Sequence, residues 1–332
     1  MTKMTDSLLV HGHCIKNRIA MLPVYTFSFH GDNGDFYGKQ HIEHYTGAAK
    51  GGTGLIILQA THVAGASTET AQWTKGSMSA LRTIAANAKS YNATVLMQLS
   101  YGGDRTVDIN KLSTEEVRAF RQEMTAAAIK AHEMGFHGVE FHFAHGFFFC
   151  KFLDAGQNQR SDVFGGSVEN RVRILTDILP EIRKNTDGNF IVAVRMGLYL
   201  PTRQEGIETA RLFEKAGIDM LDITFGMNTP KFAVPDDFPF SPVTYSGYII
   251  KQSVNIPVIG VYGIHTEEQV RLLLENDYAD MAGIGRGILA DSSFANHVMR
   301  GESVNLCCQC KQCLWFTDHR KCPAGIRAFN AV

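Results

Sequence analysis

Two histidines, His142 and His145, are candidates for chemistry because they follow directly on a predicted strand. The strand is predicted over residues 136–141, where apolar residues occupy alternate positions. A polar, glycine-containing passage over residues 154–166 comes next, and Ser167 then predicts the N-cap of a helix. Polar groups at the carboxyl end of a strand are where α/β proteins place their chemistry. Without this context the pair could also be two structural histidines or half of a metal site.

The surrounding chain alternates between strand-like and helix-like segments. The predicted strands are residues 17–23, 55–58, 94–98, 136–141, 190–195, 220–223, 257–260 and 281–285. The predicted helices lie over residues 40–50, 80–91, 114–132, 204–216, 243–252 and 266–275, with a further one from Ser167. Strands separated by helices of this length indicate parallel βαβ units, which right-handed crossovers wind into a closed (β/α)8 TIM barrel.

An open, doubly wound α/β sheet is the alternative architecture. Its dinucleotide fingerprint would make the first strand-to-helix turn rich in glycine, and Pro23-Val24-Tyr25-Thr26 is not. The barrel is therefore favoured. No break in composition marks a second domain before Asp291, so we expect a barrel over residues 1–300 and a cysteine-rich segment over residues 301–332 packed on it.

In a barrel the carboxyl ends of the strands share one face, and the residues expected there form a coherent set. The amide of Gln98 and the guanidinium of Arg195 suit a planar heterocycle with hydrogen-bonding edges. Backbone N–H groups at Gly263 and Gly285, with the side chain of Arg286, suit a phosphate near the last two strands. The remaining members of this face are Pro23, Val24, Tyr25 and Ala60, beside the two histidines.

These residues resemble those of the old yellow enzyme family of flavin-dependent oxidoreductases. The most specific match is Asn158-Gln159-Arg160-Ser161-Asp162, followed by Gly165-Gly166-Ser167 and Glu169-Asn170-Arg171. Further matches are Lys16-Asn17-Arg18-Ile19, Gly51-Gly52-Thr53-Gly54, Gly138-Val139-Glu140-Phe141-His142 with His145-Gly146, and Pro257-Val258-Ile259-Gly260. The matches are in family order and cover roughly residues 15 to 295, which argues against chance agreement.

The resemblance implies non-covalent FMN, reduction by NADH or NADPH, and hydride transfer to an electron-poor acceptor such as an α,β-unsaturated carbonyl or a quinone. It implies that His142 and His145 bind the acceptor's carbonyl oxygen and stabilise the negative charge that develops there. It places Gln98 at the pyrimidine edge of FMN and Arg195 near N1 and O2. The phosphate would be held by Gly263, Gly285 and Arg286, and the ring would pack against Pro23, Val24, Tyr25 and Ala60.

Phe147 departs from the pattern of this family. Relatives commonly have a tyrosine there that protonates the α-carbon of the substrate, and phenylalanine has no proton to give. Either another group such as Tyr25, Tyr101 or water replaces it, or the acceptor needs no such donor. Tyr25 is itself a second departure, because relatives often place a threonine or cysteine there.

Composition limits the class of partner. The 332 residues are 45% hydrophobic and carry a net charge of −1, which indicates neither nucleic acid nor an anionic membrane as partner. No apolar run is long enough for a membrane span, so we expect a cytoplasmic enzyme with a small-molecule acceptor. Whether it is a monomer or a homo-oligomer stays open at this point.

Five of the seven cysteines lie together near the C-terminus: Cys307, Cys308, Cys310, Cys313 and Cys322. They could bind zinc or an iron–sulfur cluster, as a cysteine group does in larger relatives similar to 2,4-dienoyl-CoA reductase. The spacing here differs from that of those relatives, and reduced thiols in a capping segment are the favoured interpretation. No metal ligand is therefore assigned.

Two other functions stay open at this point. A flavin-free TIM-barrel lyase or isomerase would keep the phosphate site but leave Gln98 and Arg195 without a purpose. A flavin-binding protein with little turnover would agree with Phe147.

Overall fold

The computed structural model describes residues 1–68, 71–101, 107–226 and 231–330. Eight parallel strands close into a barrel, because β3 pairs with both β4 and β11 and β4 also pairs with β6. The strands are β3 (Ile19–Met21), β4 (Leu55–Ile57), β6 (Thr94–Ser100), β7 (Gly138–Phe143), β8 (Ile191–Gly197), β9 (Met220–Thr224), β10 (Val258–Gly260) and β11 (Met281–Ile284). The short β5 (Thr61–His62) pairs with the end of β6. The predicted TIM barrel is confirmed, strand by strand.

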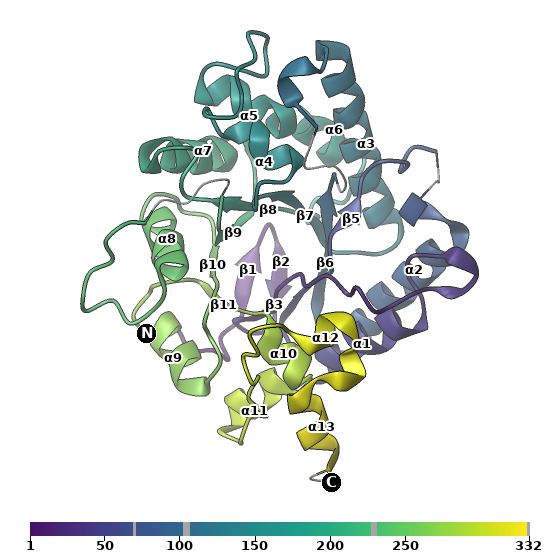
Figure 1. Cartoon of the computed structure of the whole chain (residues 1–332), viewed down its shortest axis with the longest axis vertical. Helices are drawn as coiled ribbons and strands as arrows, with labels where there is room; N and C mark the ends of the chain where they lie inside the picture. The colour runs from purple at the N-terminus through teal and green to yellow at the C-terminus, as the bar shows by residue number, and fades with distance from the viewer. Residues whose placement is uncertain (69–70, 102–106, 227–230, 331–332) are drawn as a thin grey trace.

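Helices surround the barrel, as Figure 1 shows in a view that looks into the ring of strands. They are α1 (Lys39–Lys50), α2 (Lys75–Ser90), α3 (Thr114–Glu133), α4 (Phe148–Leu153), α5 (Val168–Thr176), α6 (Leu179–Lys184), α7 (Arg203–Ala216), α8 (Pro242–Lys251) and α9 (Glu267–Glu275). Serine or threonine caps most of the longer ones; the predicted cap Ser167, for example, accepts from the backbone N–H of Asn170. No helix within the described ranges is long and apolar enough to cross a bilayer.

Alternation along the strands divides the buried residues into two cores. On β7, Val139, Phe141 and Phe143 point outward into the core between barrel and helices. A smaller apolar core fills the inside of the barrel, and its members include Leu55, Ile57, Leu96, Ile191, Ala193, Met220, Ile259 and Met281. The barrel is thus a packed structure whose interior changes from apolar to polar toward the carboxyl ends of the strands.

A hairpin that was not predicted closes the amino-terminal end of the barrel. It is formed by β1 (Leu8–Val10) and β2 (His13–Ile15), and Val10 and Ile15 join the interior core. His13 Nε2 lies 3.0 Å from Thr94 Oγ1 at the start of β6. With that end closed, the opposite end is the accessible mouth.

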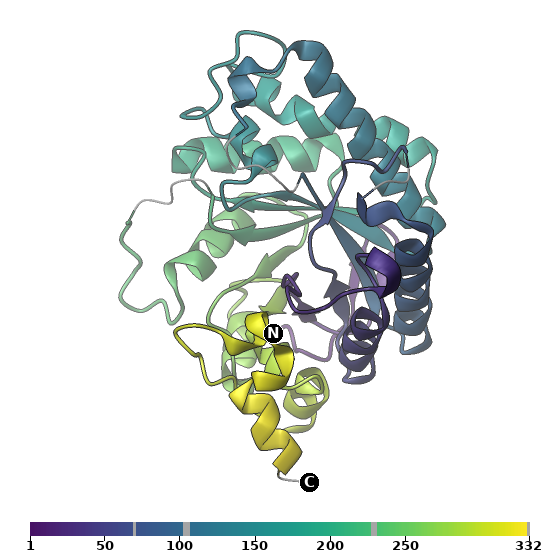
Figure 2. The same ribbon diagram turned by 45° about the vertical axis from the view of Figure 1, so that its right-hand side comes forward.

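The C-terminal segment, coloured yellow in Figures 1 and 2, follows α10 (Arg286–Ala290) and α11 (Phe294–Arg300). It contains α12 (Leu314–Thr317) and α13 (Pro323–Asn330), and α13 contacts α10. Trp315 packs on Phe29, with ring centroids 5.4 Å apart, and Phe316 packs on Phe27 at 5.9 Å. The segment that follows the barrel therefore contacts the long loop after β3.

Candidate active site

Two cavities at the carboxyl ends of the strands contain every predicted site residue. One, of about 500 Å³, is lined by Pro23, Tyr25, Phe27, Ala60, His62, Gln98, Ser100, His142, His145, Phe147 and Arg195. The other, of about 570 Å³, is lined among others by Pro23, Val24, Arg195, Thr224, Gly263, Gly285 and Arg286. Pro23 and Arg195 belong to both walls, so the cavities adjoin and together form an elongated site.

The histidine pair lies in the first cavity. His142 Nε2 is 2.9 Å from His145 Nδ1, so the two nitrogens that converge there are hydrogen-bonded to each other. His145 Nε2 lies 3.1 Å from Thr224 Oγ1 at the end of β9. The threonine hydroxyl can donate to Nε2 or accept from it, and in either case it holds the orientation of the ring. Thr224 was not predicted, although its place at a strand end is the signal that sequence reasoning could have used.

A strained turn directs the second histidine. His145 has a φ of 59°, in the left-handed region, and Gly146 follows with a φ of 70°. The backbone N–H of His145 donates to Phe225 O at 3.1 Å, which holds the turn against the loop after β9. Non-glycine residues in this conformation cost about 1 kcal/mol or more and concentrate at functional sites.

Below the histidines, four polar side chains form two pairs inside the barrel. Gln98 Nε2 donates to Glu140 Oε1 at 2.7 Å, and these residues are direct neighbours in the β6–β7 register. Arg195 Nε lies 3.2 Å from Asp222 Oδ2, and these are neighbours in the β8–β9 register. Neither acid was predicted. Each occupies an inward position of its strand between outward apolar residues, and that alternation was a usable signal.

The second cavity has the features of an anion site. Ideal Cβ atoms built on Gly263 and Gly285 would meet no protein atom within 4 Å, so both glycines border open space. Gly263 also has a φ of 81°, which favours glycine. With Arg286 and the backbone N–H groups nearby, this end suits a phosphate, while Gln98 and Arg195 suit the heterocycle. The donor set therefore fits FMN along the two adjoining cavities.

The C-terminal segment contributes to the same cavity, which the sequence did not indicate. Gln309, Cys310, Lys311, Cys313 and Phe316 line it opposite the barrel. Over the residues that the structure describes, no three His, Cys, Asp or Glu side chains gather as a metal-binding group.

The aromatic residues near the histidines occupy different places. Phe147 lines the histidine cavity, and its ring meets that of His142 edge-on at 5.2 Å. Tyr25 lines the same cavity, and burial raises the pKa of its phenol. Tyr101 instead packs between Phe120 and Phe148, at 4.7 and 4.6 Å, and is not among the described residues of the cavity wall.

The passage that carried the strongest resemblance has a structural role. Asn158 Nδ2 donates to the carbonyl oxygens of Phe152 and Phe164, and Arg171 donates to that of Leu153. Arg160 pairs with Asp162. These contacts fix the loop after α4 and leave its side chains outside the two cavities.

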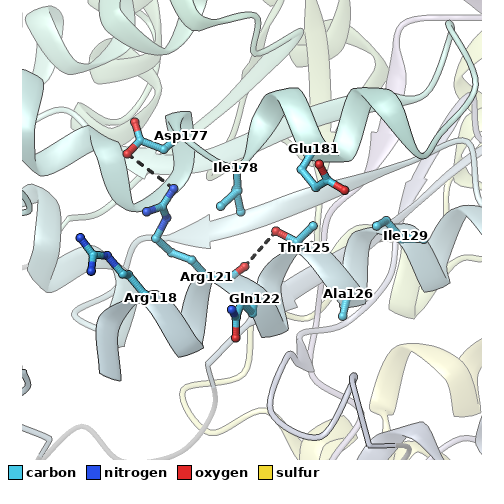
Figure 3. A pocket seen from close by; sticks show the side chains of 9 residues that line it. All are labelled: Arg118, Arg121, Gln122, Thr125, Ala126, Ile129, Asp177, Ile178 and Glu181. Atoms are coloured by element: carbon cyan, nitrogen blue, oxygen red, sulfur yellow. Dashed lines mark hydrogen bonds and ion pairs between the residues drawn. The ribbon is translucent and has the colours of Figure 1, made fainter. Parts of the chain in front are cut away.

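A third hollow, of about 490 Å³, lies outside the barrel between α3 and the α5–α6 junction (Figure 3). Arg121 Nη2 is 3.5 Å from Asp177 Oδ2 across it. It contains none of the predicted site residues, and the apolar side chains of Ala126, Ile129 and Ile178 form much of its wall. The chemistry-bearing groups are at the barrel mouth.

Comparison with known proteins gives a consistent result. Residues 106–305 match the model of the NADH:flavin oxidoreductase / NADH oxidase family. The NADPH dehydrogenase of Listeria welshimeri is 30% identical, over 89% of this chain and 94% of its own length. The NADH oxidase of Thermoanaerobacter brockii is 26% identical over 89% of this chain, which spans about half (51%) of that longer relative.

Solved structures show the same fold. The old yellow enzyme homologue of Zymomonas mobilis aligns with a TM-score of 0.72 at 20% identity, over 95% of this chain and 99% of its own. A complex of 2-naphthoyl-CoA reductase with 2-naphthoyl-CoA aligns with a TM-score of 0.82 at 21% identity, over 95% of this chain and 55% of its own.

Proposed function

This chain belongs to the NADH:flavin oxidoreductase / NADH oxidase family, the old yellow enzyme family, with FMN as cofactor and NAD(P)H as reductant, and we propose that it reduces electron-poor acceptors of the enone or quinone type. The observation that carries the proposal is the convergence of His142 Nε2 and His145 Nδ1, 2.9 Å apart, in the cavity bordered by Gln98 and Arg195. In this hydrogen bond one ring nitrogen donates and the other accepts, so the accepting ring must take its other tautomer before both nitrogens can donate to a single carbonyl oxygen.

Each group of residues at the site has a separate role. When bound, FMN would carry the hydride from NAD(P)H to the acceptor. The side chains of Gln98 and Arg195 hold its heterocycle, and Gly263, Gly285 and Arg286 hold its phosphate, with Pro23, Val24 and Ala60 packed beside it. An acceptor oxygen that enters the cavity replaces the hydrogen bond between the histidines, and the two N–H groups stabilise the negative charge that develops on it.

Tyr25 is the proton donor that we propose for enone acceptors. Its phenol lines the histidine cavity, where Phe147 offers no proton and Tyr101 is turned into aromatic packing. The raised pKa of Tyr25 keeps the phenol protonated at neutral pH. Quinone acceptors need no protonation at carbon, so this residue distinguishes the ene reductase from the quinone reductase.

Anaerobic stopped-flow tests the proposal. We expect the flavin absorbance to bleach with NADPH or NADH and to recover with cyclohexenone, and Tyr25→Phe to slow the recovery with cyclohexenone but not with a quinone. Recovery with a quinone only would restrict the acceptor class and leave Tyr25 without this role. Protein that purifies without flavin would support the flavin-free lyase or isomerase instead, and flavin that no acceptor reoxidises would support a binding protein.

The setting of the enzyme completes the proposal. Dependence on NAD(P)H is the reason for proposing a cytoplasmic location, which cell fractionation tests. Residues 301–332 are proposed as a cysteine-rich segment that packs on the barrel of residues 1–300, since Cys310, Lys311 and Cys313 line part of the cavity at its mouth. A homo-oligomer with no nucleic-acid or membrane partner stays a prediction, and light scattering of the purified protein tests it.

A further inference from the structure

Two carboxylic acids lie inside the barrel directly beneath the residues proposed to hold the flavin. The side chains of Glu140 and Asp222 are both fully buried. They point inward because Glu140 precedes the inward His142 by two positions on β7, and Asp222 precedes the inward Thr224 by two on β9. Acids are rarely buried this completely unless a partner compensates for their charge.

Among the described residues each acid has one side-chain partner, and that partner faces the cofactor site. Glu140 accepts from Gln98 Nε2 at 2.7 Å, and Asp222 lies 3.2 Å from Arg195 Nε. Glu140 Oε2 and both carboxylate oxygens of Asp222 are buried without an aligned hydrogen bond among the described residues. Within the described part of the chain, the two acids therefore contact the site through Gln98 and Arg195.

The charges of this group do not balance if both acids are ionised. The described groups that face the pair are Gln98 on β6, His142 on β7, Arg195 on β8 and Thr224 on β9, and among them Arg195 alone carries a fixed positive charge. Leu96, Ala193 and Met220 below them are apolar. Burial raises the pKa of both acids, and Asp222 raises that of Glu140 further, while Arg195 lowers both.

We propose that Glu140 and Asp222 form a buried acid pair that holds one proton against the single charge of Arg195, and that both are positioning residues that set the reduction potential of the flavin. Asp222 keeps the guanidinium of Arg195 at the cavity wall and neutralises part of its charge. Glu140 fixes the amide of Gln98 by accepting from its nitrogen. The inference depends on the FMN site of the proposed function but on no acceptor.

A second consequence concerns protons. Reduction of the flavin adds negative charge beside Arg195, and this charge makes ionised Glu140 less favourable. At alkaline pH, where Glu140 is ionised in the oxidised enzyme, reduction should therefore be accompanied by uptake of a proton at its carboxylate. Free FMN has no such group, so its proton uptake on reduction is the reference.

The test measures the midpoint potential of the bound flavin between pH 6 and pH 9, by reduction with dithionite in the absence of acceptor. The double variant Asp222→Asn with Glu140→Gln should raise the ratio of reduced to oxidised FMN affinity about tenfold, which is about 30 mV for two electrons, since it leaves Arg195 without an ionised partner. Glu140→Gln should match the wild type at pH 6 but lose the extra pH dependence at alkaline pH. The matched control is Asp219→Asn, which removes a buried acid paired with Arg183 at the other end of β9 and should leave the potential unchanged.

Holoenzyme variants of Glu140 and Asp222 with the potential of the wild type at every pH would overturn the proposal. If neither variant folds, proton uptake by the wild-type enzyme tests the proposal without them. Proton uptake on reduction, followed with a pH indicator in weakly buffered solution, should exceed that of free FMN at pH 9, and equal uptake refutes the acid pair. A wild-type protein that cannot bind FMN contradicts the proposed function, and this result is distinguishable from either outcome above.

Discussion

The hydroxyl of Thr224 lies 3.1 Å from Nε2 of His145, while the other ring nitrogen of that histidine faces His142 at 2.9 Å. The hydroxyl of a threonine at the end of β9 thus holds the ring of a histidine that follows β7. It can donate to Nε2 or accept from it, and in either case it keeps Nδ1 directed at His142, where an acceptor oxygen would bind.

Replacing Thr224 by valine should lower kcat/KM for the acceptor about tenfold, equivalent to about 1.4 kcal/mol, because His145 loses the hydrogen bond that holds its ring in place. Thr224→Ser keeps the hydroxyl and is the control. The rate of flavin reoxidation in single-turnover stopped-flow is the measurement, with FMN content checked by absorbance. Equal rates for the valine and serine variants would show that Thr224 has no role in holding the ring of His145.

Removing either histidine should act on the acceptor and spare the cofactor. His142→Ala should reduce kcat for acceptor reduction by about 10² to 10³, the usual effect of losing one donor to a developing oxyanion. The bound FMN fraction should stay that of the wild type, since His142 contacts His145 and not the phosphate end. A variant that loses FMN along with activity would contradict this division of the two cavities.

Gly285→Ala should weaken FMN binding while the fold is kept. The added methyl group meets no protein atom within 4 Å, so it projects into the space assigned to the phosphate. We expect the Kd for FMN, measured by fluorescence quenching, to rise at least about tenfold, a loss of about 1.4 kcal/mol. Gly188→Ala is the matched control, because its Cβ also meets nothing within 4 Å but lies in the loop before β8. Similar Kd values for both variants would show that the phosphate does not bind at Gly285.

Acid should destabilise the protein through buried neutral histidines. Burial lowers the pKa of His41 and of His137 to about 4, and His137 Nδ1 accepts from the backbone N–H of Val95 at 3.0 Å. The unfolded chain takes up protons below about pH 6.5 that the folded state does not, so stability present above that pH is lost as the pH falls toward 4. Each such group should contribute about 1.4 kcal/mol per pH unit to the fall in the free energy of unfolding.

The measurement is urea unfolding between pH 7 and pH 4.5. His137→Gln keeps a hydrogen-bond acceptor for Val95 and should reduce the slope of the free energy of unfolding against pH. An unchanged slope would show that His137 does not contribute to the loss of stability in acid.

The barrel was predictable because its strands and helices are encoded by residues that lie close together in the sequence. Most strands are short apolar runs, and most of the longer helices begin at a capping residue such as Ser167. The β1–β2 hairpin was missed because its strands are only three residues long, although its turn, with φ values of 45° at His11 and 77° at Gly12, has a glycine that could have indicated it.

The residues that line the candidate site were predictable from the sequence, but the hydrogen bonds and ion pairs between them were not. Strand ends placed Gln98, Arg195 and the histidines at one mouth. The partners Glu140, Asp222 and Thr224 depend on the register between neighbouring strands, which the order of residues along one strand does not contain. The lining by Cys310 and Lys311 depends on how a C-terminal coil folds back on the barrel, for which no periodicity exists.

Phe147→Tyr is the variant that separates the two acceptor classes. The ring of Phe147 already meets that of His142 edge-on at 5.2 Å in the cavity wall, so the substitution adds a phenol beside the acceptor without changing the shape of the ring. If the enzyme reduces enones by way of Tyr25, a second proton donor should restore activity to Tyr25→Phe, with a rate gain of about 10² or more for cyclohexenone. Quinone reduction should change less than about twofold, since oxygen rather than carbon takes up the proton. A double variant with no gain on cyclohexenone, measured beside wild-type quinone activity, would show that position 147 cannot deliver a proton to the bound acceptor.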